Sequence, residues 1–153
     1  MTVSKPAFIV TSEQGAVFNI GAHTVTEKIT CEQSGGDYYV IQQVSPPGSF
    51  VPPHVHSLED EIVFIDEGEF EIFLGGKTSR AGPGATLHFA RGTYHGFKIV
   101  GERPGRSTWV ITPGTNFQTF FREVATFPPG PPDFARLDEL HAKHGMIMPP
   151  PPV

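Results

Sequence analysis

Hydrophobic and polar residues alternate along the chain in short runs, and turn residues separate one run from the next. The segment 23–30, HTVTEKIT, alternates β-branched and polar residues, and the segment 38–44, YYVIQQV, is the strongest pattern of this kind. Such period-two runs predict β-strands that bury one face. About ten short strands at regular spacing are typical of a β-sandwich or β-barrel. The further predicted strands are 6–10, 16–20, 61–67, 69–76, 77–80, 86–90, 95–100 and 107–113.

After residue 113 the aromatic and aliphatic residues recur at helical spacing. One helix is predicted over 115–125, and a second between the N-cap residue Asp133 and the C-cap residue Gly145. We divide the chain into a barrel domain, residues 1–125, and an extension, residues 126–153. The extension consists of a Pro-rich linker, a helix and a polyproline tail, and we expect it to pack on the barrel. Its helix either closes over the barrel as a lid or packs on its outside.

Composition limits the kind of protein. The chain has 153 residues, enough for one domain with a buried core, and a formal net charge of −5. No Lys/Arg-rich stripe is present, so we expect no nucleic-acid partner. No apolar run approaches the length of a membrane span, and the apolar stretch near the N-terminus is too short for a signal peptide. The single cysteine, Cys31, cannot form an internal disulfide. We therefore expect a cytoplasmic protein without a membrane partner.

Four side chains that commonly bind metals cluster in two segments. His54 and His56 follow the irregular segment 46–53, PPGSFVPP, and their spacing directs both imidazoles to one face of a strand. Glu61 begins the next predicted strand, and His95 lies in a separate turn. Because neighbouring strands lie about 5 Å apart, three imidazoles and one carboxylate can meet around one ion. Imidazole suits Zn, Cu, Fe and Ni, and a carboxylate adds affinity for harder ions. Four ligands leave octahedral positions open, as a catalytic metal requires.

Two motifs resemble those of the cupin superfamily. In 48–68, the two histidines, the glutamate and the two flanking glycines have the spacing of the family's first motif. The segment 82–99 resembles the second motif, with its histidine and Gly92 in place. Ala90 and Ile99 stand where the family has proline and asparagine, and neither change removes a ligand.

The resemblance covers nearly the whole chain and is strongest with single-domain bacterial cupins often labelled quercetin-dioxygenase-like. It implies an all-β fold, the cupin double-stranded β-helix or jelly-roll barrel, with a short C-terminal helical extension. It also implies one divalent metal ion bound by His54, His56, Glu61 and His95. Fe2+ is the first choice, and Ni2+, Mn2+, Co2+ or Zn2+ are alternatives. A homodimer is frequent in the family and is expected here.

Three functions are compatible with this resemblance, because one fold hosts many activities. The first is a metal-dependent oxygenase of the dioxygenase type that acts on a small aromatic or polyketide-like molecule, with Glu61 as ligand or general base. The second is a non-redox isomerase, cyclase or lyase that uses the metal as a Lewis acid and Glu61, Tyr94 or Tyr39 as base. The third is a small-molecule-binding protein without turnover. The apolar lining expected for the pocket is Tyr39, Ile41, Phe50, Val63, Phe73, Phe97, Trp109 and Ile111.

Other polar residues near the motifs are interpreted without a catalytic role. Glu59 and Asp60 can orient an imidazole from behind, but residues in a turn are more often solvated. His88 is expected on the outer face of its strand. His141 and His144 are expected to face solvent or to cap the C-terminal helix.

Overall fold

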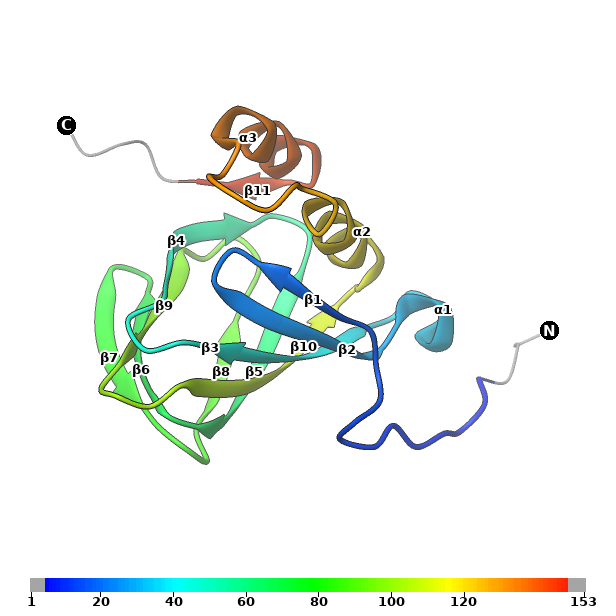
Figure 1. Cartoon of the computed structure of the whole chain (residues 1–153), viewed down its shortest axis with the longest axis horizontal. Coiled ribbons are helices and arrows are strands. Elements are labelled where there is room, and N and C mark those ends of the chain that lie inside the picture. Colours follow the sequence, from blue (N-terminus) through cyan, green and yellow to red (C-terminus); the bar gives the residue numbers. More distant parts are fainter. Residues whose placement is uncertain (1–4, 149–153) are drawn as a thin grey trace.

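Two antiparallel β-sheets form the body of the protein (Figure 1). The computed structural model describes residues 5–148 of the chain. One sheet has the strand order β1-β2-β3-β10-β5-β8, and the other has the order β11-β4-β9-β6-β7. The predicted all-β class is confirmed. The strands are β1 (Val17–Ile20), β2 (His23–Ile29), β3 (Tyr39–Ser45), β4 (Phe50–His56), β5 (Asp60–Glu67), β6 (Glu69–Leu74), β7 (Lys77–Ala81), β8 (Thr86–Phe89), β9 (His95–Val100), β10 (Gly105–Thr112) and β11 (Met146–Ile147).

The alternation in the sequence places every second side chain between the two sheets. In β3 and β10, every second residue is buried and the residues between them are partly buried or exposed. Aromatic side chains pack between and within the sheets: the ring centroids of Phe97 and Trp109, on opposite sheets, are 5.9 Å apart, and those of Phe97 and Phe70, on the same sheet, are 5.5 Å apart. The core combines aromatic and aliphatic side chains, and the inner faces of the sheets also carry the polar side chains described below.

Two parts of the predicted strand pattern are wrong. The segment 6–10 forms no strand, and its Ile9 is 87% exposed. It pairs with no strand of either sheet, and its Pro6 has no N–H to donate to a ladder. The second error is the segment 46–53, which was expected to be irregular but contributes its second half to β4.

The prolines of β4 explain why this strand was missed. Pro52 and Pro53 lie where the register between β4 and β9 shifts, so that their missing N–H groups cost no ladder hydrogen bond. Gly96 of β9 faces this irregularity, and a Cβ atom there would lie 2.5 Å from the Val51 carbonyl oxygen. A glycine is therefore required at the point where the strand with the histidines crosses closest to its neighbour.

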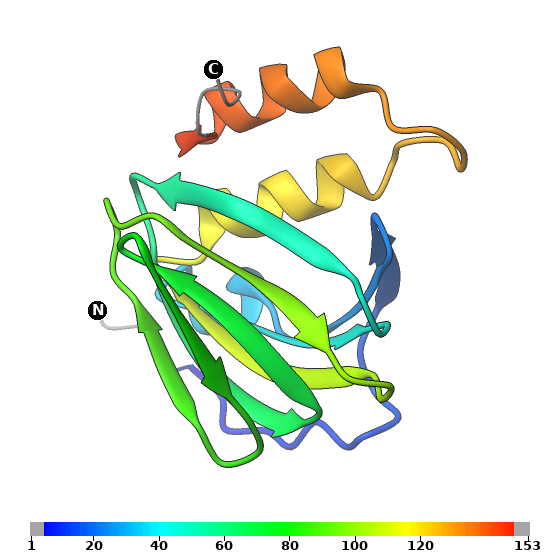
Figure 2. The ribbon, with the colours of Figure 1, turned by 90° about the vertical axis from the view of Figure 1, so that its left-hand side faces the viewer.

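Two helices lie over one end of the barrel, stacked above the strands in Figure 2, the first before residue 126 and the second in the extension. These are α2 (Thr115–Val124) and α3 (Phe134–Lys143), while the short α1 (Cys31–Ser34) lies before β3. After α3, strand β11 pairs with β4, and the Ser57 N–H donates to the Gly145 carbonyl oxygen at 3.0 Å. The chain's own C-terminal segment thus extends the sheet beside the strand that carries two predicted ligands. The polyproline prediction for the tail concerns residues 149–153, outside the described residues.

Within residues 5–148, none of the helices is long and apolar enough to cross a membrane.

Arg122 fixes α2 to the barrel. Its Nε atom lies 2.9 Å from Glu27 Oε1 on β2, and its Nη1 atom lies 2.8 Å from Glu32 Oε1 on α1. The Glu27 side chain is 6% exposed and also accepts a hydrogen bond from the Tyr39 hydroxyl at 2.8 Å. The guanidinium therefore compensates a buried carboxylate and fixes the position of a helix that forms part of the site wall.

We expect Arg122→Met to lower the free energy of unfolding by about 1.5–3 kcal/mol at neutral pH, because charged hydrogen bonds to a buried carboxylate are lost. Hydrogen bonding to Arg122 lowers the pKa of Glu32 to about 2. A carboxyl group whose pKa is lower in the folded than in the unfolded state stabilises the folded state at pH values above its unfolded-state pKa. This stabilisation is lost as the pH falls through the folded-state pKa. Glu32 is exposed, so solvent screens much of its contribution to the free energy of unfolding.

Urea titrations of wild type and Arg122→Met at several pH values measure this difference. The difference should shrink as the pH falls from about 5 toward about 3. Arg103→Met is the matched control, because no ion pair of Arg103 with a described residue is found, and it should change stability little. A difference for Arg122→Met that stays constant over this range would show that Glu32 does not contribute.

Candidate metal centre

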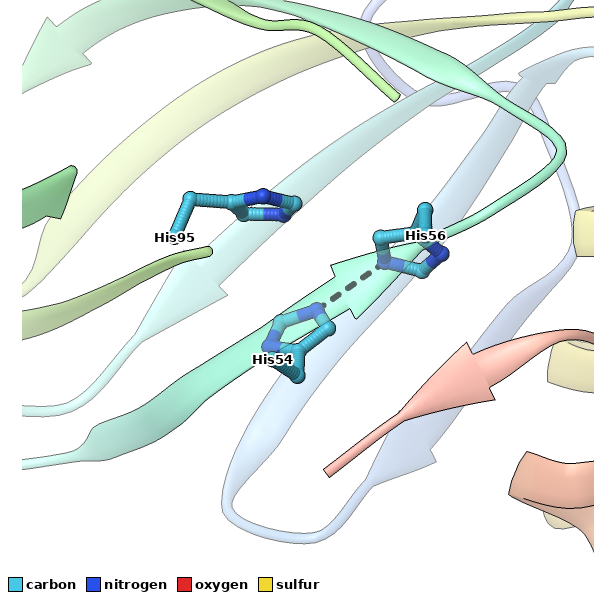
Figure 3. Close-up of side chains that lie close together, drawn as sticks. All are labelled: His54, His56 and His95. Atoms are coloured by element: carbon cyan, nitrogen blue, oxygen red, sulfur yellow. Dashed lines mark hydrogen bonds between the residues drawn. The ribbon is translucent and has the colours of Figure 1, made fainter. Parts of the chain in front are cut away.

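Three imidazoles from two neighbouring strands converge inside the barrel, as Figure 3 shows. His54 and His56 lie on β4, and His95 lies on β9 directly opposite His54 in the register. One nitrogen from each ring lies within 4.8 Å of the others. The Nε2 atoms of His54 and His56 are 2.9 Å apart. This spacing allows one ion to contact all three rings.

The carboxylate of Glu61 reaches the same point from the facing sheet. Glu61 lies on β5, and its side chain is 2% exposed. Its Oε2 atom is 2.7 Å from His95 Nε2, and its Oε1 atom is 3.7 Å from His56 Nε2. The structure thus brings together all four side chains that the sequence predicts as ligands.

For His54 and His95, the hydrogen-bond partner on the side away from the centre shows which ring nitrogen carries the hydrogen. His54 Nδ1 lies 2.9 Å from the Pro52 carbonyl oxygen, and His95 Nδ1 lies 3.0 Å from the Thr93 carbonyl oxygen. A carbonyl oxygen only accepts hydrogen bonds, so both Nδ1 atoms must carry the ring hydrogen. Both Nε2 atoms then present lone pairs to the centre, as metal-ligating imidazoles do.

The Glu59 carboxylate lies beside the ring nitrogen of His56 that points away from the centre. Its Nδ1 atom lies 3.6 Å from Glu59 Oε2, and the Glu59 side chain is fully buried. Burial opposes a charge on His56, but Glu61 and Glu59 outweigh burial and raise its pKa. Burial also opposes a charge on Glu61, but the charge of the nearby His56 outweighs it and holds the pKa of Glu61 at about 2. For His54, burial and the neighbouring imidazoles lower the pKa to about 4.

Lone pairs and a negative carboxylate therefore converge without enough donors to compensate them. His95 Nε2 and Glu61 Oε2 are both sealed from solvent and have no hydrogen-bond partner among the described residues. Such a group of acceptors is costly unless a cation lies among them. A proton on His56 supplies part of that charge, and a divalent metal supplies more while displacing the proton. The donor set of three imidazoles and one carboxylate fits a divalent transition metal.

Glu59 belongs to a buried network rather than to a solvated turn. Its Oε1 atom accepts a hydrogen bond from Asn116 Nδ2 at 2.5 Å, and the same amide donates to the His144 carbonyl oxygen at 2.8 Å. His144 is 3% exposed, so the expectation that it faces solvent is wrong, although it does cap α3. By contrast, Asp60 pairs with Arg91 at 2.9 Å near the surface.

A cavity of about 970 Å³ extends from the four converging side chains to the helices α2 and α3. It is lined by Phe117, Phe120, Phe121 and Val124 of α2 and by Phe134, Leu137, Asp138 and His141 of α3. The helix α3 thus forms part of the cavity wall, and His141 borders the cavity instead of solvent alone. The cavity is mostly apolar and rich in aromatic side chains, as a site for an apolar ring system would be. The phenylalanines on its wall are Phe18, Phe50, Phe97, Phe117, Phe120, Phe121, Phe127 and Phe134.

The two tyrosines predicted as bases do not border this cavity. Tyr39 is fully buried beside it, and burial together with its hydrogen bond to Glu27 raises its pKa. Tyr94 is 41% exposed and lines a separate surface depression with Phe73. A phenol acts as a base only if its pKa is lowered, so the position of Tyr39 disfavours that role. Neither position supports the predicted catalytic role.

The predicted apolar lining is found in part. Ile41, Phe50, Phe97 and Trp109 border the cavity. The other four do not: Val63 and Ile111 are sealed in the core, Tyr39 packs on Glu27, and Phe73 faces the outer depression. The polar wall residues His23 and Gln43 belong to no motif in the sequence, and only the folding of β2 and β3 against the other sheet brings them to the cavity.

Known proteins share this sequence pattern and fold. A family model described as Cupin domain matches residues 41–111, which include all four predicted ligands. Quercetin 2,3-dioxygenase from Bacillus subtilis is 25% identical over 93 residues, which are 61% of this chain and 27% of that protein. The chain therefore spans about a quarter of the length of this curated relative.

Two solved structures show the same architecture. KdgF from Halomonas sp. has a TM-score of 0.64 at 20% identity, over 74% of this chain and 98% of that one. The polyketide cyclase RemF from Streptomyces resistomycificus has a TM-score of 0.60 at 23% identity, over 70% and 79% of the two chains. These matches support the cupin superfamily, and the predicted jelly-roll barrel is confirmed.

Proposed function

We propose that this protein is a metal-dependent oxygenase of the dioxygenase type that acts on a small aromatic or polyketide-like molecule. The observation that carries the proposal is the convergence of three imidazoles and a sealed carboxylate at the inner end of a large aromatic cavity. The similarity to quercetin 2,3-dioxygenase supports the same reaction class. We propose Fe2+ as the resident ion, with Ni2+, Mn2+, Co2+ or Zn2+ as alternatives. A homodimer and a cytoplasmic location stay predictions.

His54, His56, His95 and Glu61 would hold the ion. A divalent metal in this donor set supplies a Lewis acid for an enolate or phenolate oxygen and, as a redox-active ion, one-electron chemistry with O2. The Pro52 carbonyl orients the His54 ring by accepting its Nδ1 hydrogen, which keeps Nε2 available as a ligand.

The remaining roles belong to the wall and to Glu61. Phe97, Trp109 and Phe117 border the cavity and exclude water from a bound ring system. Glu61 is ionised in this arrangement, as its low pKa indicates. It can therefore accept a proton from a substrate hydroxyl, but only at an oxygen that is not used as a ligand.

The test begins with elemental analysis of protein purified without a histidine tag. Oxygen consumption is then measured with quercetin and with acetylacetone as probes, before and after chelation of the metal. We expect substrate-dependent oxygen uptake that disappears on chelation and returns with the removed metal. Conversion of a probe under nitrogen, without oxygen uptake, would contradict the oxygenase. Binding without conversion under either atmosphere would contradict both enzyme proposals and leave a binding protein.

A second candidate is a non-redox isomerase, cyclase or lyase. The observation that favours it is the presence of two further imidazoles, His23 and His141, on the cavity wall. Burial lowers the pKa of both, so they are neutral at pH 7, and a neutral imidazole such as that of His141 can accept a proton on its unprotonated nitrogen. Zinc as the resident metal, with product formation under nitrogen, would support this candidate, because zinc does not take part in redox chemistry.

A further inference from the structure

Three connected polar side chains lie inside the barrel beyond the predicted metal ligands. His23 at the start of β2 is 8% exposed, and Gln43 and Ser45 on β3 are 6% and 0% exposed. The His23 ring centroid lies 5.8 Å from that of Phe97, which is two residues along β9 from His95. His23 and Gln43 both border the cavity. Buried polar groups are costly unless they are bonded, so this cluster needs an explanation.

The hydrogen bonds of Ser45 determine which atoms remain available. Its Oγ atom lies 2.8 Å from His23 Nδ1 and accepts a hydrogen bond from Gln43 Nε2 at 3.2 Å. The hydroxyl hydrogen finds no other acceptor among the described residues, so it is donated to His23 Nδ1. Burial lowers the pKa of His23, which keeps the ring neutral. The single ring hydrogen is therefore on Nε2.

One donor and one acceptor are then left without protein partners among the described residues. They are His23 Nε2–H and the Gln43 amide oxygen, and neither is among the sealed, unpartnered atoms. Both belong to residues of the cavity wall. An oriented donor beside an oriented acceptor is how a binding site recognises a hydroxyl group, which offers both functions.

The charged side chains of the cavity wall limit which chemical groups can bind beside His23 and Gln43. The described residues that line it include the acids Glu61 and Asp138 but no lysine or arginine. A carboxylate or phosphate on the substrate would therefore find no positive side chain at this end, and burying an unpaired charge is costly. A neutral hydroxyl or carbonyl group meets no such penalty.

We propose that His23 and Gln43 form a recognition subsite for a neutral hydroxyl or carbonyl group at the end of the substrate that lies away from the metal ligands. Ser45 is the positioning residue, because its hydroxyl fixes the ring hydrogen of His23 on the side facing the cavity. The subsite rests on the proposed function in one respect: the metal binds the other end of the same aromatic molecule. The substrate class is then a neutral ring system with polar groups at both ends.

Calorimetric titration of the metal-containing protein under nitrogen tests the subsite with two matched pairs of probes. One pair is 2-naphthol with 2,6-dihydroxynaphthalene, and the other is 4-hydroxybiphenyl with 4,4′-dihydroxybiphenyl. In at least one pair, the second hydroxyl should tighten binding about 3- to 10-fold, which corresponds to one net hydrogen bond. 6-Hydroxy-2-naphthoic acid should bind more weakly than 2-naphthol, because its carboxylate has no counter-charge.

Substitutions then show which residues cause the difference in affinity within a pair. His23→Leu should bring the affinity ratio within the pair to about one, since it removes the donor. Ser45→Ala should lower the ratio while keeping the imidazole, and it serves as the test if His23→Leu does not fold. His88→Leu is the matched control, because His88 is exposed on β8 and should leave the ratio unchanged.

The outcomes separate the two proposals. A wild-type ratio of about one for both pairs, or a ratio that neither variant changes, would overturn the subsite while leaving the aromatic substrate class intact. Failure of all the phenols to bind would overturn the proposed substrate class together with the subsite. Tighter binding of the naphthoic acid would overturn the assignment of a neutral group.

Discussion

Replacing His95 by alanine should reduce the metal content of the purified protein from about one ion per chain to background. Its Nε2 atom lies 2.7 Å from Glu61 Oε2 and is sealed from solvent, so the substitution removes one of the four converging donor groups. Loss of partners that only orient ligands already costs about 10–100-fold in metal affinity, and we expect the loss of a ligand to cost more. Elemental analysis of untagged protein measures the effect.

Thermal unfolding gives a second readout that does not depend on activity. A metal present at about 100 times its dissociation constant stabilises the folded state by about 2.7 kcal/mol. Wild type should therefore lose stability on chelation, whereas His95→Ala should be insensitive to the chelator. Without metal, His95→Ala should lose no more stability than the removal of a buried side chain of this size explains. The substitution also removes one of the converging lone pairs, which repel one another when no metal is bound.

His88→Ala is the matched control for this experiment. His88 is an exposed histidine on β8 and lies outside the cavity wall. Its removal should change neither the metal content nor the response to chelation. A folded His95→Ala protein with wild-type metal content would show that the ligand assignment is incorrect.

The positions of the four converging side chains could be predicted because their geometry is local. A spacing of two residues places His54 and His56 on one face of a strand, and Glu61 follows within one turn. The same rule argues against Tyr94, which directly precedes His95 and therefore points to the opposite side. Its exposure of 41% agrees with this alternation.

The strand that carries the histidines was harder to predict than the histidines themselves. Proline is a strong signal against a strand, and two prolines interrupt β4. Whether they are tolerated depends on the register with β9 and on Gly96 opposite them, more than 40 residues away in sequence. No pattern within 46–53 contains that information.

The supporting contacts of the site could not be predicted for a similar reason. Glu59 and Asn116 are 57 positions apart, and His144 is 28 positions beyond Asn116. In sequence Glu59 resembles any acid in a polar turn, and only the packing of α2 against that turn buries it. The same holds for α3, whose place on the cavity wall is fixed by the pairing of β11 with β4.

Replacing Glu59 by glutamine should lower the metal affinity about 10–100-fold while leaving the protein folded. Glu59 Oε2 lies 3.6 Å from His56 Nδ1, and Oε1 accepts the Asn116 hydrogen bond at 2.5 Å. A glutamine keeps the shape but has no charge, and its amide group cannot accept from both partners. His56 then loses the carboxylate that orients its ring. Competition titration of Co2+ against a chromophoric chelator measures the affinity.

The adjacent carboxylate provides a control with nearly the same position in sequence. Asp60 pairs with Arg91 near the surface and has no contact with the three imidazoles among its hydrogen bonds. Asp60→Asn should therefore change the Co2+ affinity much less than Glu59→Gln. Equal losses in the two variants would indicate a general disturbance of the turn and would contradict a specific role for Glu59.

The same network should transmit metal binding to the extension. Asn116 donates to both Glu59 and the His144 carbonyl oxygen, so it links the partner of His56 to the end of α3. Directly after α3, β11 pairs with β4 at Met146 opposite His56. When the metal holds His56 in place, this edge should open less often, and its amide hydrogens should exchange more slowly. In Asn116→Ala the metal should lose much of this protection. Equal exchange at Met146 with and without metal in the wild type would show that the coupling stops at Glu59.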